Sequence, residues 1–434
     1  MRRFITYILM AVFAFSISIM NVGCSNKQVN ESTSSVEAAT YIYKQKEYVV
    51  KNRQYCMQGD VYFPDELWEQ PTVEYISGYD RYNGSVKAYY LKSVPNQGEA
   101  TDVFAYVGIP NGATKDNPVP GIVLVHGGGG TAFPDWVRSW MDNGYAAIAI
   151  DTEGNVPPKD VTMHSAVNCA QTSLRNHGPN NTHYADSSKA IEEQFLYHAV
   201  AATIVANSFL GSFEEVDENQ IGLTGISWGG VIATNVACYD DRFAFCAPIY
   251  GAMAMKGTGG SFGTMYNNNP RAAELWDNHN LLSDCRTPML FVNWNADPFF
   301  AINATSACVT TAQQAEMVLI DSLGHGHGVG ANIAEILVFA NSVLRRSKVA
   351  LPQFATYPSF ENPTFTFDGV DLKNIRITLY TTKEEKLSPD TAWESTTLPV
   401  NSATLHLDLG SDVKAFYVTI ERKDFRSTCP VVKR

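Results

Sequence analysis

The chain has 434 residues, of which 45% are hydrophobic and 18% are charged, and it carries a net charge of −12 at pH 7. These values are typical of a globular protein with ample material for a core, and the absence of low-complexity tracts and of repeats at solenoid spacing excludes a tail or repeat protein. The length predicts two domains, and the acidic balance opposes nucleic acid as a partner, because phosphates are bound by basic patches.

Residues 1–24 have the pattern of a targeting signal. Two arginines follow the initiator methionine, residues 4–20 are apolar, and Gly23 precedes Cys24. The arrangement resembles a bacterial lipoprotein signal, which implies a lipid on Cys24, a flexible tether over residues 25–40 and membrane attachment in the cell envelope, at the periplasm or outer membrane. Asn21 departs from the aliphatic residue preferred there, so ordinary cleavage and an uncleaved anchor remain alternatives. Each alternative places the rest of the chain outside the cytoplasm.

Three strands are predicted next, over residues 72–77, 85–93 and 102–109, separated by turns rich in Gly, Asp and Asn. We expect them to form an antiparallel edge of a sheet. The region is too short for a β-propeller, whose blades need about 40 to 45 residues each, so a propeller-gated peptidase is not expected.

A fully apolar run over residues 121–125 leads into His126 and four consecutive glycines. Such a run predicts a buried central strand, and the glycines permit close approach of backbone N–H groups to a ligand. We interpret Gly128 and Gly129 as donors to a developing oxyanion. A plain glycine loop is the alternative, and a phosphate cradle is disfavoured because no Gly-Lys-Ser/Thr follows.

Residues 151–187 lack periodicity and are rich in Asn, Pro, Gly and His, which predicts a long insertion that shapes a binding pocket. His164, His177 and His183 lie in it. Their spacing fits no metal-ligand pattern, so we expect solvent-facing or loop-stabilising roles, no metal and no cofactor.

The pentapeptide Gly225-Ile226-Ser227-Trp228-Gly229 lies between an apolar run and a helix-like stretch. This context is typical of a nucleophile elbow, in which a serine hydroxyl is exposed on a tight strand-to-helix turn. Ser227 is therefore the predicted nucleophile. Trp228 is a predicted oxyanion donor through its backbone N–H.

Two later strands each end in a candidate partner for Ser227. The strand over residues 287–294 precedes Asp297, which would orient the base, although an Asp before Pro298 also commonly caps a turn. The strand over residues 316–321 precedes His325 and His327 on a glycine-rich loop. We favour His325 as the base because it lies at the usual short distance past the strand, and His327 is the alternative base.

The chain order Ser, Asp, His is that of α/β-hydrolases. The sequence resembles the prolyl-oligopeptidase-like α/β-hydrolases related to acetyl xylan esterases and dienelactone hydrolases. The stretches that carry the resemblance are residues 126–133, 136–138, 144–151, 197–200, 221–230, 240–243 and 248–251. It implies a mostly parallel sheet with helices on both faces over residues 41–348, and hydrolysis of acylated carbohydrates or small esters.

Beyond residue 348 the pattern changes to a proline-rich linker and then to alternating runs over residues 374–380, 403–409 and 413–420. These runs predict a small β-sandwich-like, all-β domain over residues 362–434. A packing role is favoured over polysaccharide binding.

The chain contains eight cysteines, so setting Cys24 aside leaves an odd number and at least one free thiol. We expect Cys238 and Cys246 to be small buried hydrophobic residues, with a bridge between them as the alternative.

The favoured function is an exported, serine-dependent carbohydrate esterase that acts through an acyl-enzyme. A serine peptidase or amidase of the same resemblance is the second hypothesis. A catalytically silent binding protein is the third.

Overall fold

The computed structural model describes residues 40–43, 46–49, 61–165, 172–173, 176–368 and 372–434. The predicted signal segment, Cys24 and residues 25–39 of the predicted tether therefore lie outside the described residues. Within the described part of the chain, no helix is both long and apolar enough to cross a bilayer.

Six parallel strands form the centre of a large sheet, in the order β7-β6-β10-β11-β12-β13. Their bounds are β6 Val119–Val125, β7 Ala146–Ile150, β10 Val216–Ile226, β11 Phe245–Ile249, β12 Met289–Asn293 and β13 Ala315–Leu319. Residues 122–125 of β6 are fully buried, because strands covered on both faces need apolar side chains at every position.

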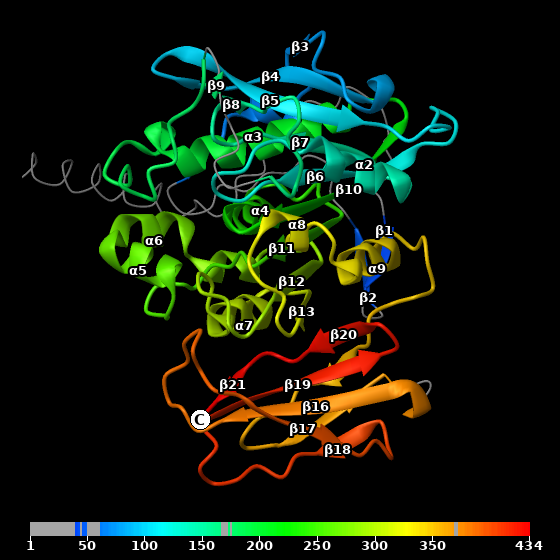
Figure 1. Cartoon of the computed structure of the whole chain (residues 1–434), viewed down its shortest axis with the longest axis vertical. Coiled ribbons are helices and arrows are strands. Elements are labelled where there is room, and N and C mark those ends of the chain that lie inside the picture. Colours follow the sequence, from blue (N-terminus) through cyan, green and yellow to red (C-terminus); the bar gives the residue numbers. More distant parts are fainter. Residues whose placement is uncertain (1–39, 44–45, 50–60, 166–171, 174–175, 369–371) are drawn as a thin grey trace, which may run out of the picture. The chain divides into compact units, whose positions relative to one another are not determined.

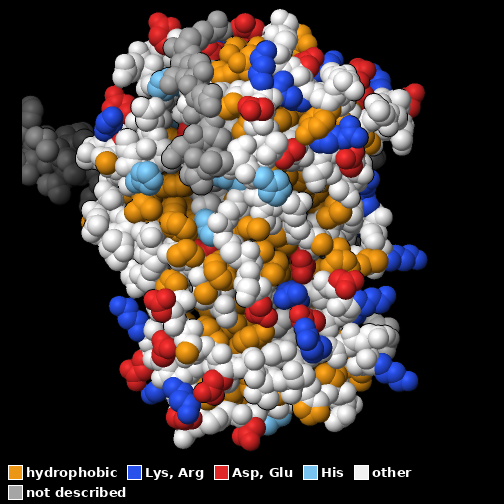
Figure 2. Space-filling view, viewed as in Figure 1, with side chains coloured by type: hydrophobic (Ala, Val, Ile, Leu, Met, Phe, Trp, Pro, Cys, Tyr) orange, Lys and Arg blue, Asp and Glu red, His pale blue; other side chains and the backbone are white. Residues whose placement is uncertain are grey.

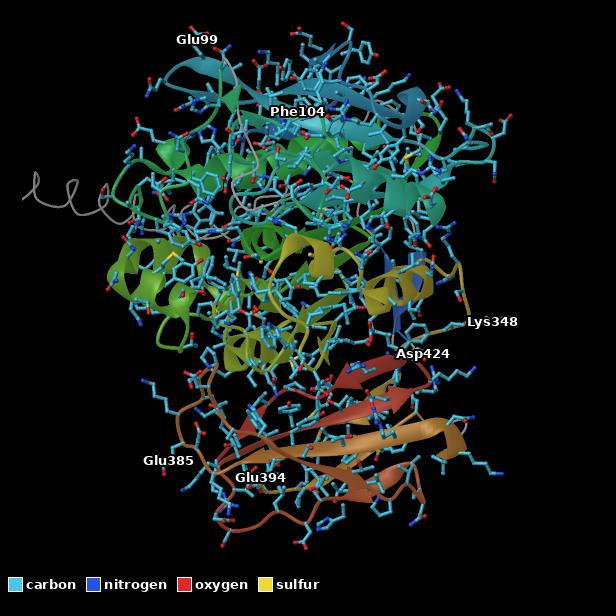
Figure 3. The ribbon with its side chains drawn as sticks, viewed as in Figure 1. Glu99, Phe104, Lys348, Glu385, Glu394 and Asp424 are labelled. Carbon is cyan, nitrogen blue, oxygen red and sulfur yellow. The ribbon has the colours of Figure 1, made fainter. Side chains whose placement is uncertain are left out.

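The antiparallel edge predicted before this centre is present. Strands β5 (Glu99–Gly108), β4 (Val86–Asn96) and β3 (Val73–Tyr75) follow β7 across the sheet, each antiparallel to its neighbour. Phe104 on β5 is fully buried, whereas Glu99 at the start of the same strand is exposed (Figure 3).

Helices cover both faces of the sheet, as the sequence predicts (Figure 1). The residue pairings across β5, β7, β6 and β10 place Gly108 and Gly222 in one row of the sheet, so the two glycines lie on the same face. Gly108 faces α2 (Pro134–Asp142), and Phe245 beside Gly222 packs against α9 (Ala334–Val343). Gly121, on the opposite face, meets α3 (Phe195–Leu210), which in turn contacts α4 (Trp228–Tyr239).

The connections leaving β6 and β10 run in opposite directions, because the chain passes from β6 to β7 and then returns across β6 to β10. A crevice outside the carboxyl ends of two such strands is the usual ligand site of an open parallel sheet. The loops that follow β6, β10, β12 and β13 all start at this edge.

Further short elements complete this part of the chain. They are β1 Thr40–Tyr43, β2 Lys46–Val49, β8 Asn155–Val156, β9 Thr172–Ser173, α5 Ser261–Asn268, α6 Pro270–Trp276, α7 Ile302–Thr311 and α8 His327–Gly330.

The described residues between 354 and 434, called here the C-terminal β region, contribute strands to two sheets. The strands are β14 Phe354–Thr356, β15 Thr364–Phe367, β16 Ile375–Thr382, β17 Glu394–Leu398, β18 Thr404–His406, β19 Ala415–Arg422, β20 Phe425–Thr428 and β21 Val432–Lys433. One sheet has the order β14-β15-β18, and its first strand begins before residue 362. The other, β17-β16-β19-β20 with β21 beside β19, continues the central sheet, because β20 pairs with β13 through Met317 and Thr428 (Figure 1).

Candidate active site

Ser227 occupies a sharp bend between β10 and α4. Its backbone is left-handed, with φ 57°, which is a strained conformation for a residue with a side chain, and such strain clusters at functional sites. A Cβ atom on Gly225 would lie 2.0 Å from the carbonyl oxygen of Gly229, and one on Gly229 would lie 2.1 Å from that of Val125. The bend therefore requires glycine on both sides of Ser227, as the pentapeptide predicts.

The structure brings Ser227, His325 and Asp297 together. Ser227 Oγ lies 2.9 Å from His325 Nε2, and His325 Nδ1 lies 2.7 Å from Asp297 Oδ2. Because a carboxylate only accepts hydrogen bonds, Nδ1 is the donor to Asp297, and the lone pair on Nε2 is left to accept the serine proton.

Asp297 is 1% exposed, and four donors satisfy its carboxylate. Besides His325, the indole N–H of Trp294 donates to Oδ2 over 2.9 Å, and the backbone N–H groups of Phe299 and Phe300 donate to Oδ1 over 2.9 and 2.8 Å. The two bonds from the backbone N–H groups to Oδ1 are those of an Asp that caps a turn. Capping and orientation of the imidazole are thus combined in one side chain.

Aromatic rings hold the imidazole of His325 in place. Its centroid lies 4.5 Å from the rings of Tyr250 and Phe299 and 6.1 Å from that of Phe300. Phe299 is 36% exposed, so part of its ring remains open to a ligand beside the base.

His325, not His327, bonds Ser227 Oγ, and His327 contacts the glycine loop instead. Its Nε2 accepts the backbone N–H of Gly127 over 3.0 Å, and its ring packs 5.0 Å from that of Phe133. Burial, with a smaller contribution from His126, lowers the pKa of His327 to about 4. His327 is therefore neutral at pH 7, and its only lone pair on nitrogen is already in use.

The predicted oxyanion donors differ in what their N–H groups contact. Trp228 is the first residue of α4, where backbone N–H groups lack an intrahelical acceptor. Gly129 donates to Glu153 Oε1 over 3.2 Å. Among the described residues, neither the N–H of Gly128 nor that of Trp228 has an acceptor, so these two are the donors left for a ligand.

His126 fixes the start of the glycine loop, a role that the sequence did not reveal. Its Nε2 accepts the backbone N–H of Thr152 over 2.9 Å, so Nδ1 is the donor to the carbonyl oxygen of Gly127, at 2.7 Å. The ring is 2% exposed. A histidine between a buried strand and four glycines was the available signal, but its partner, Thr152, lies on another loop.

Trp228 also forms part of an aromatic wall. Its ring lies 4.7 Å from Phe262, 5.1 Å from Tyr184 and 6.0 Å from His183. His183 and Tyr184 belong to the irregular insertion and both have positive φ angles, of 52° and 68°. This part of the insertion thus contacts the residue that follows the nucleophile.

The other two histidines of the insertion lie on nearby loops. His177 bonds the carbonyl oxygen of Gly178 through Nδ1 over 2.6 Å, and His164 packs against Gly328. No three His, Cys, Asp or Glu side chains in the described ranges are grouped so as to hold a metal ion. Figure 2 shows several histidine side chains among hydrophobic ones across the middle of the visible face.

All five described cysteines are buried free thiols, so Cys238 and Cys246 are not bridged to each other. Burial raises the pKa of both thiols. Cys24, Cys56 and Cys169 lie outside the described residues.

Comparisons with known proteins give matches to solved structures and to a family. No curated protein matches the sequence. The acetyl xylan esterase from Paenibacillus sp. R4 is 20% identical, with 59% of this chain and 84% of that chain covered and a TM-score of 0.46. Acetyl xylan esterase 1 from Thermoanaerobacterium sp. JW/SL YS485 is 16% identical, with 61% and 87% covered and a TM-score of 0.46. A carbohydrate esterase family 15 glucuronoyl esterase from Caldicellulosiruptor kristjansonii is 17% identical, with 66% and 82% covered and a TM-score of 0.43.

The family match is to the dienelactone hydrolase family and covers residues 103–331. This segment is more than half of the 434 residues and contains every loop of the site described above. The protein is therefore an enzyme of the α/β-hydrolase type, and it belongs to the dienelactone hydrolase family.

Proposed function

We propose that the protein is a serine-dependent carboxylic ester hydrolase. The observation that carries the proposal is the continuous chain of hydrogen bonds from Ser227 through His325 to Asp297. A serine is a weak nucleophile until an adjacent base accepts its proton, and this chain supplies a base held in the correct tautomer.

The proposed reaction begins when Ser227 Oγ attacks the ester carbonyl and His325 Nε2 takes the hydroxyl proton. The oxygen that becomes negative accepts hydrogen bonds from the N–H groups of Trp228 and Gly128. When the intermediate collapses, the bond to the alcohol breaks and His325 returns the proton to the leaving oxygen. A water molecule, deprotonated by His325, then attacks the acyl-enzyme, and Ser227 leaves with that proton.

We further propose that the substrates are acylated carbohydrates carrying small neutral acyl groups. The part-exposed ring of Phe299 beside His325 is a surface on which a sugar ring can pack. At the glycine loop, Glu153 and Asn181 hydrogen-bond each other next to Gly129 and offer polar groups to sugar hydroxyls. The chain carries a net charge of −12, which suits neutral substrates better than polyanions.

The test compares wild type with Ser227→Ala on p-nitrophenyl acetate, acetylated xylan and a matched amide reporter. We expect release of acetate by the wild type only, and labelling of Ser227 by a fluorophosphonate. Faster cleavage of the amide would point to a peptidase instead. A folded wild type that is neither labelled nor active on any of the three would indicate a binding protein.

We also propose that Cys24 is lipidated, which would hold the enzyme in the bacterial cell envelope as an exported protein. Gly23-Cys24 after the apolar run supports this proposal. Expression of the full chain with labelled palmitate should give a labelled membrane-bound protein, and Cys24→Ser should abolish the label. An unlabelled, soluble full-length product would exclude the lipid anchor.

A further inference from the structure

The loop that carries the catalytic acid is tied to the C-terminal β region. Asn295, two residues before Asp297, donates its side-chain amide to the hydroxyl of Tyr417 over 3.1 Å. Tyr417 lies on β19, is fully buried and also packs 4.9 Å from the ring of Trp393. A buried, ring-packed hydroxyl is a fixed acceptor, so it sets the position of Asn295 within the loop after β12.

The loop that carries the base is tied to the neighbouring strand of the same region. Tyr380, on β16, donates its hydroxyl to Asp321 Oδ2 over 2.9 Å, and Asp321 precedes His325 in the loop after β13. Burial, followed by the bond to Asp321, raises the pKa of Tyr380 to about 12, so the hydroxyl keeps its proton at any pH at which the enzyme would work.

The two hydroxyls belong to one rigid unit. Tyr380 and Tyr417 are direct partners across β16 and β19, and their rings stack 4.5 Å apart at an interplanar angle of 10°. Facing aromatic pairs on adjacent strands stabilise a sheet and restrict each other's rotation. The loop that carries Asp297 and the loop that carries His325 are therefore both hydrogen-bonded to this one pair of tyrosines.

The C-terminal β region is also hydrogen-bonded to β13, the strand that precedes the loop with His325. The N–H of Leu319, the last residue of β13, donates to the Thr428 hydroxyl over 3.1 Å, where β20 pairs with β13. Val431, which follows β20, donates its N–H to the Ser306 hydroxyl of α7, the helix after the acid loop, over 2.9 Å. The C-terminal β region thus holds both loops at their hydroxyl contacts and at the adjacent elements.

We propose that Tyr417 and Tyr380 are positioning residues, through which the C-terminal β region sets the distance between Asp297 and His325. The inference rests on the proposed function, because it assigns a task to the same acid and base. An imidazole must be held close to its productive geometry, and a displacement of about 1 Å can cost up to about 10²-fold in rate. The region is then part of the catalytic apparatus rather than an appended packing module.

The main test is Tyr417→Phe, which removes one hydroxyl and keeps the ring. The matched control is Tyr145→Phe, because Tyr145 is also buried and its hydroxyl donates to an asparagine, Asn341 of α9, over 2.9 Å. We expect kcat on p-nitrophenyl acetate to fall about 5- to 10-fold in Tyr417→Phe with KM within about twofold, while Tyr145→Phe keeps the kcat of the wild type. Equal effects of the two variants on kcat would overturn the proposal.

Substitutions of Asn295 and of Asp321 test the same contacts from the loops and leave both aromatic rings in place. Asn295→Ala should lower kcat as much as Tyr417→Phe, and the double variant should be no slower than either single one, since both remove the same bond. Asp321→Asn keeps an oxygen that accepts from Tyr380 and should retain more activity than Asp321→Ala. Additive losses in the double variant would contradict a shared contact.

A readout independent of turnover separates this inference from the proposed function. The proton between His325 and Asp297 should give a downfield resonance in the proton NMR spectrum. That resonance should shift or broaden in Tyr417→Phe and stay unchanged in Tyr145→Phe. If the wild type hydrolyses no ester, the proposed function fails, and the resonance still decides whether Tyr417 positions the pair: an unchanged resonance in Tyr417→Phe would reject it.

Discussion

The backbone N–H of Gly127 donates a hydrogen bond to Nε2 of His327 over 3.0 Å. The bond joins the start of the glycine loop to the loop that also carries His325, and it occupies the lone pair that a base would need. His325 has no such constraint, because its Nε2 faces Ser227 Oγ. The two histidines, separated by one glycine, thus have different tasks, one toward the nucleophile and one toward the glycine loop.

This difference predicts unequal losses on substitution. His325→Ala should lower kcat on p-nitrophenyl acetate by about 10³-fold, because general-base catalysis contributes about 10² to 10⁴. His327→Ala should lower it only about 10-fold, through a displaced glycine loop. Steady-state kinetics with melting temperatures as a folding control would check this. A His327→Ala variant as slow as His325→Ala would reject our choice of base.

His327 should also make the stability of the wild type depend on pH. Its pKa is about 4 in the folded protein and about 6.5 when unfolded, so between these values the unfolded state binds more protons and stability falls as pH falls. His327→Gln keeps an acceptor for Gly127 but does not titrate. Relative to this variant, the wild type should lose about 2 kcal/mol of unfolding free energy between pH 7 and pH 5. Urea unfolding at both pH values measures the difference, and a pH-independent difference would contradict the burial of His327.

Gly251 lies so close to the backbone of α4, just after Ser227, that we expect no larger residue to be tolerated there. A Cβ atom there would lie 2.1 Å from the carbonyl carbon of Gly230, the third residue of α4. Gly251→Ala should therefore destabilise the protein by about 3 kcal/mol, at the upper end of the cost of overpacking. Gly259→Ala is the control, because its nearest contacts would be 3.4 Å or longer. Thermal melts of both variants test this, and similar melting temperatures would show that the turn can shift.

Much of the fold could be predicted from the sequence because its signals are local. Unbroken apolar runs mark the buried parallel strands, and the glycines around Ser227 mark a bend that has no room for a Cβ atom at Gly225 or Gly229. The order of Ser227, Asp297 and His325 could be predicted for the same reason, since each lies just past such a run. The structure then brings these three side chains within hydrogen-bond distance.

Contacts between distant segments could not be predicted. Of the two predicted oxyanion donors Gly128 and Gly129, only Gly128 keeps a free N–H among the residues that the structure describes, because Glu153, which lies past the next strand, accepts the N–H of Gly129. Continuation of the central sheet into the C-terminal β region depends on the pair Met317 and Thr428, and a single antiparallel pair leaves no pattern in the sequence. Such long-range pairs are fixed by the packing of the whole domain rather than by local propensity.

Buried thiols predict a simple chemical result. Cys238, Cys246 and Cys285 are buried free thiols, and burial raises the pKa of each, so the reactive thiolate is scarce and shielded. We expect iodoacetamide to leave these three residues unmodified in the native protein and to alkylate them in denaturant without a reductant. Peptide mass spectrometry checks both states. Recovery of a peptide pair joined through Cys238 and Cys246 would contradict the structure.

Glu153 predicts discrimination against anionic acyl groups. Its carboxylate lies at the glycine loop, 3.2 Å from the N–H of Gly129, and no ion pair joins it to a Lys or Arg in the described part of the chain. If an acyl group carries a negative charge about 8 Å from the Glu153 carboxylate, the two charges repel each other by about 2 kcal/mol without salt and by roughly 1 kcal/mol with salt screening. Glu153→Gln keeps the acceptor for Gly129 and removes the charge. We expect kcat/KM for a succinyl monoester to rise about fivefold in Glu153→Gln and that for the acetyl ester to stay within about twofold.

Glu214 provides the control for this effect, because it precedes β10 and so lies at the opposite edge of the sheet, exposed and paired with Lys115 over 2.9 Å. Glu214→Gln removes the same charge from the whole molecule, so it should leave the preference between the two esters unchanged. The gain in Glu153→Gln should also shrink as ionic strength rises, since salt screens the repulsion. A gain of the same size in both variants would mean that net charge, rather than the carboxylate at the glycine loop, selects the acyl group.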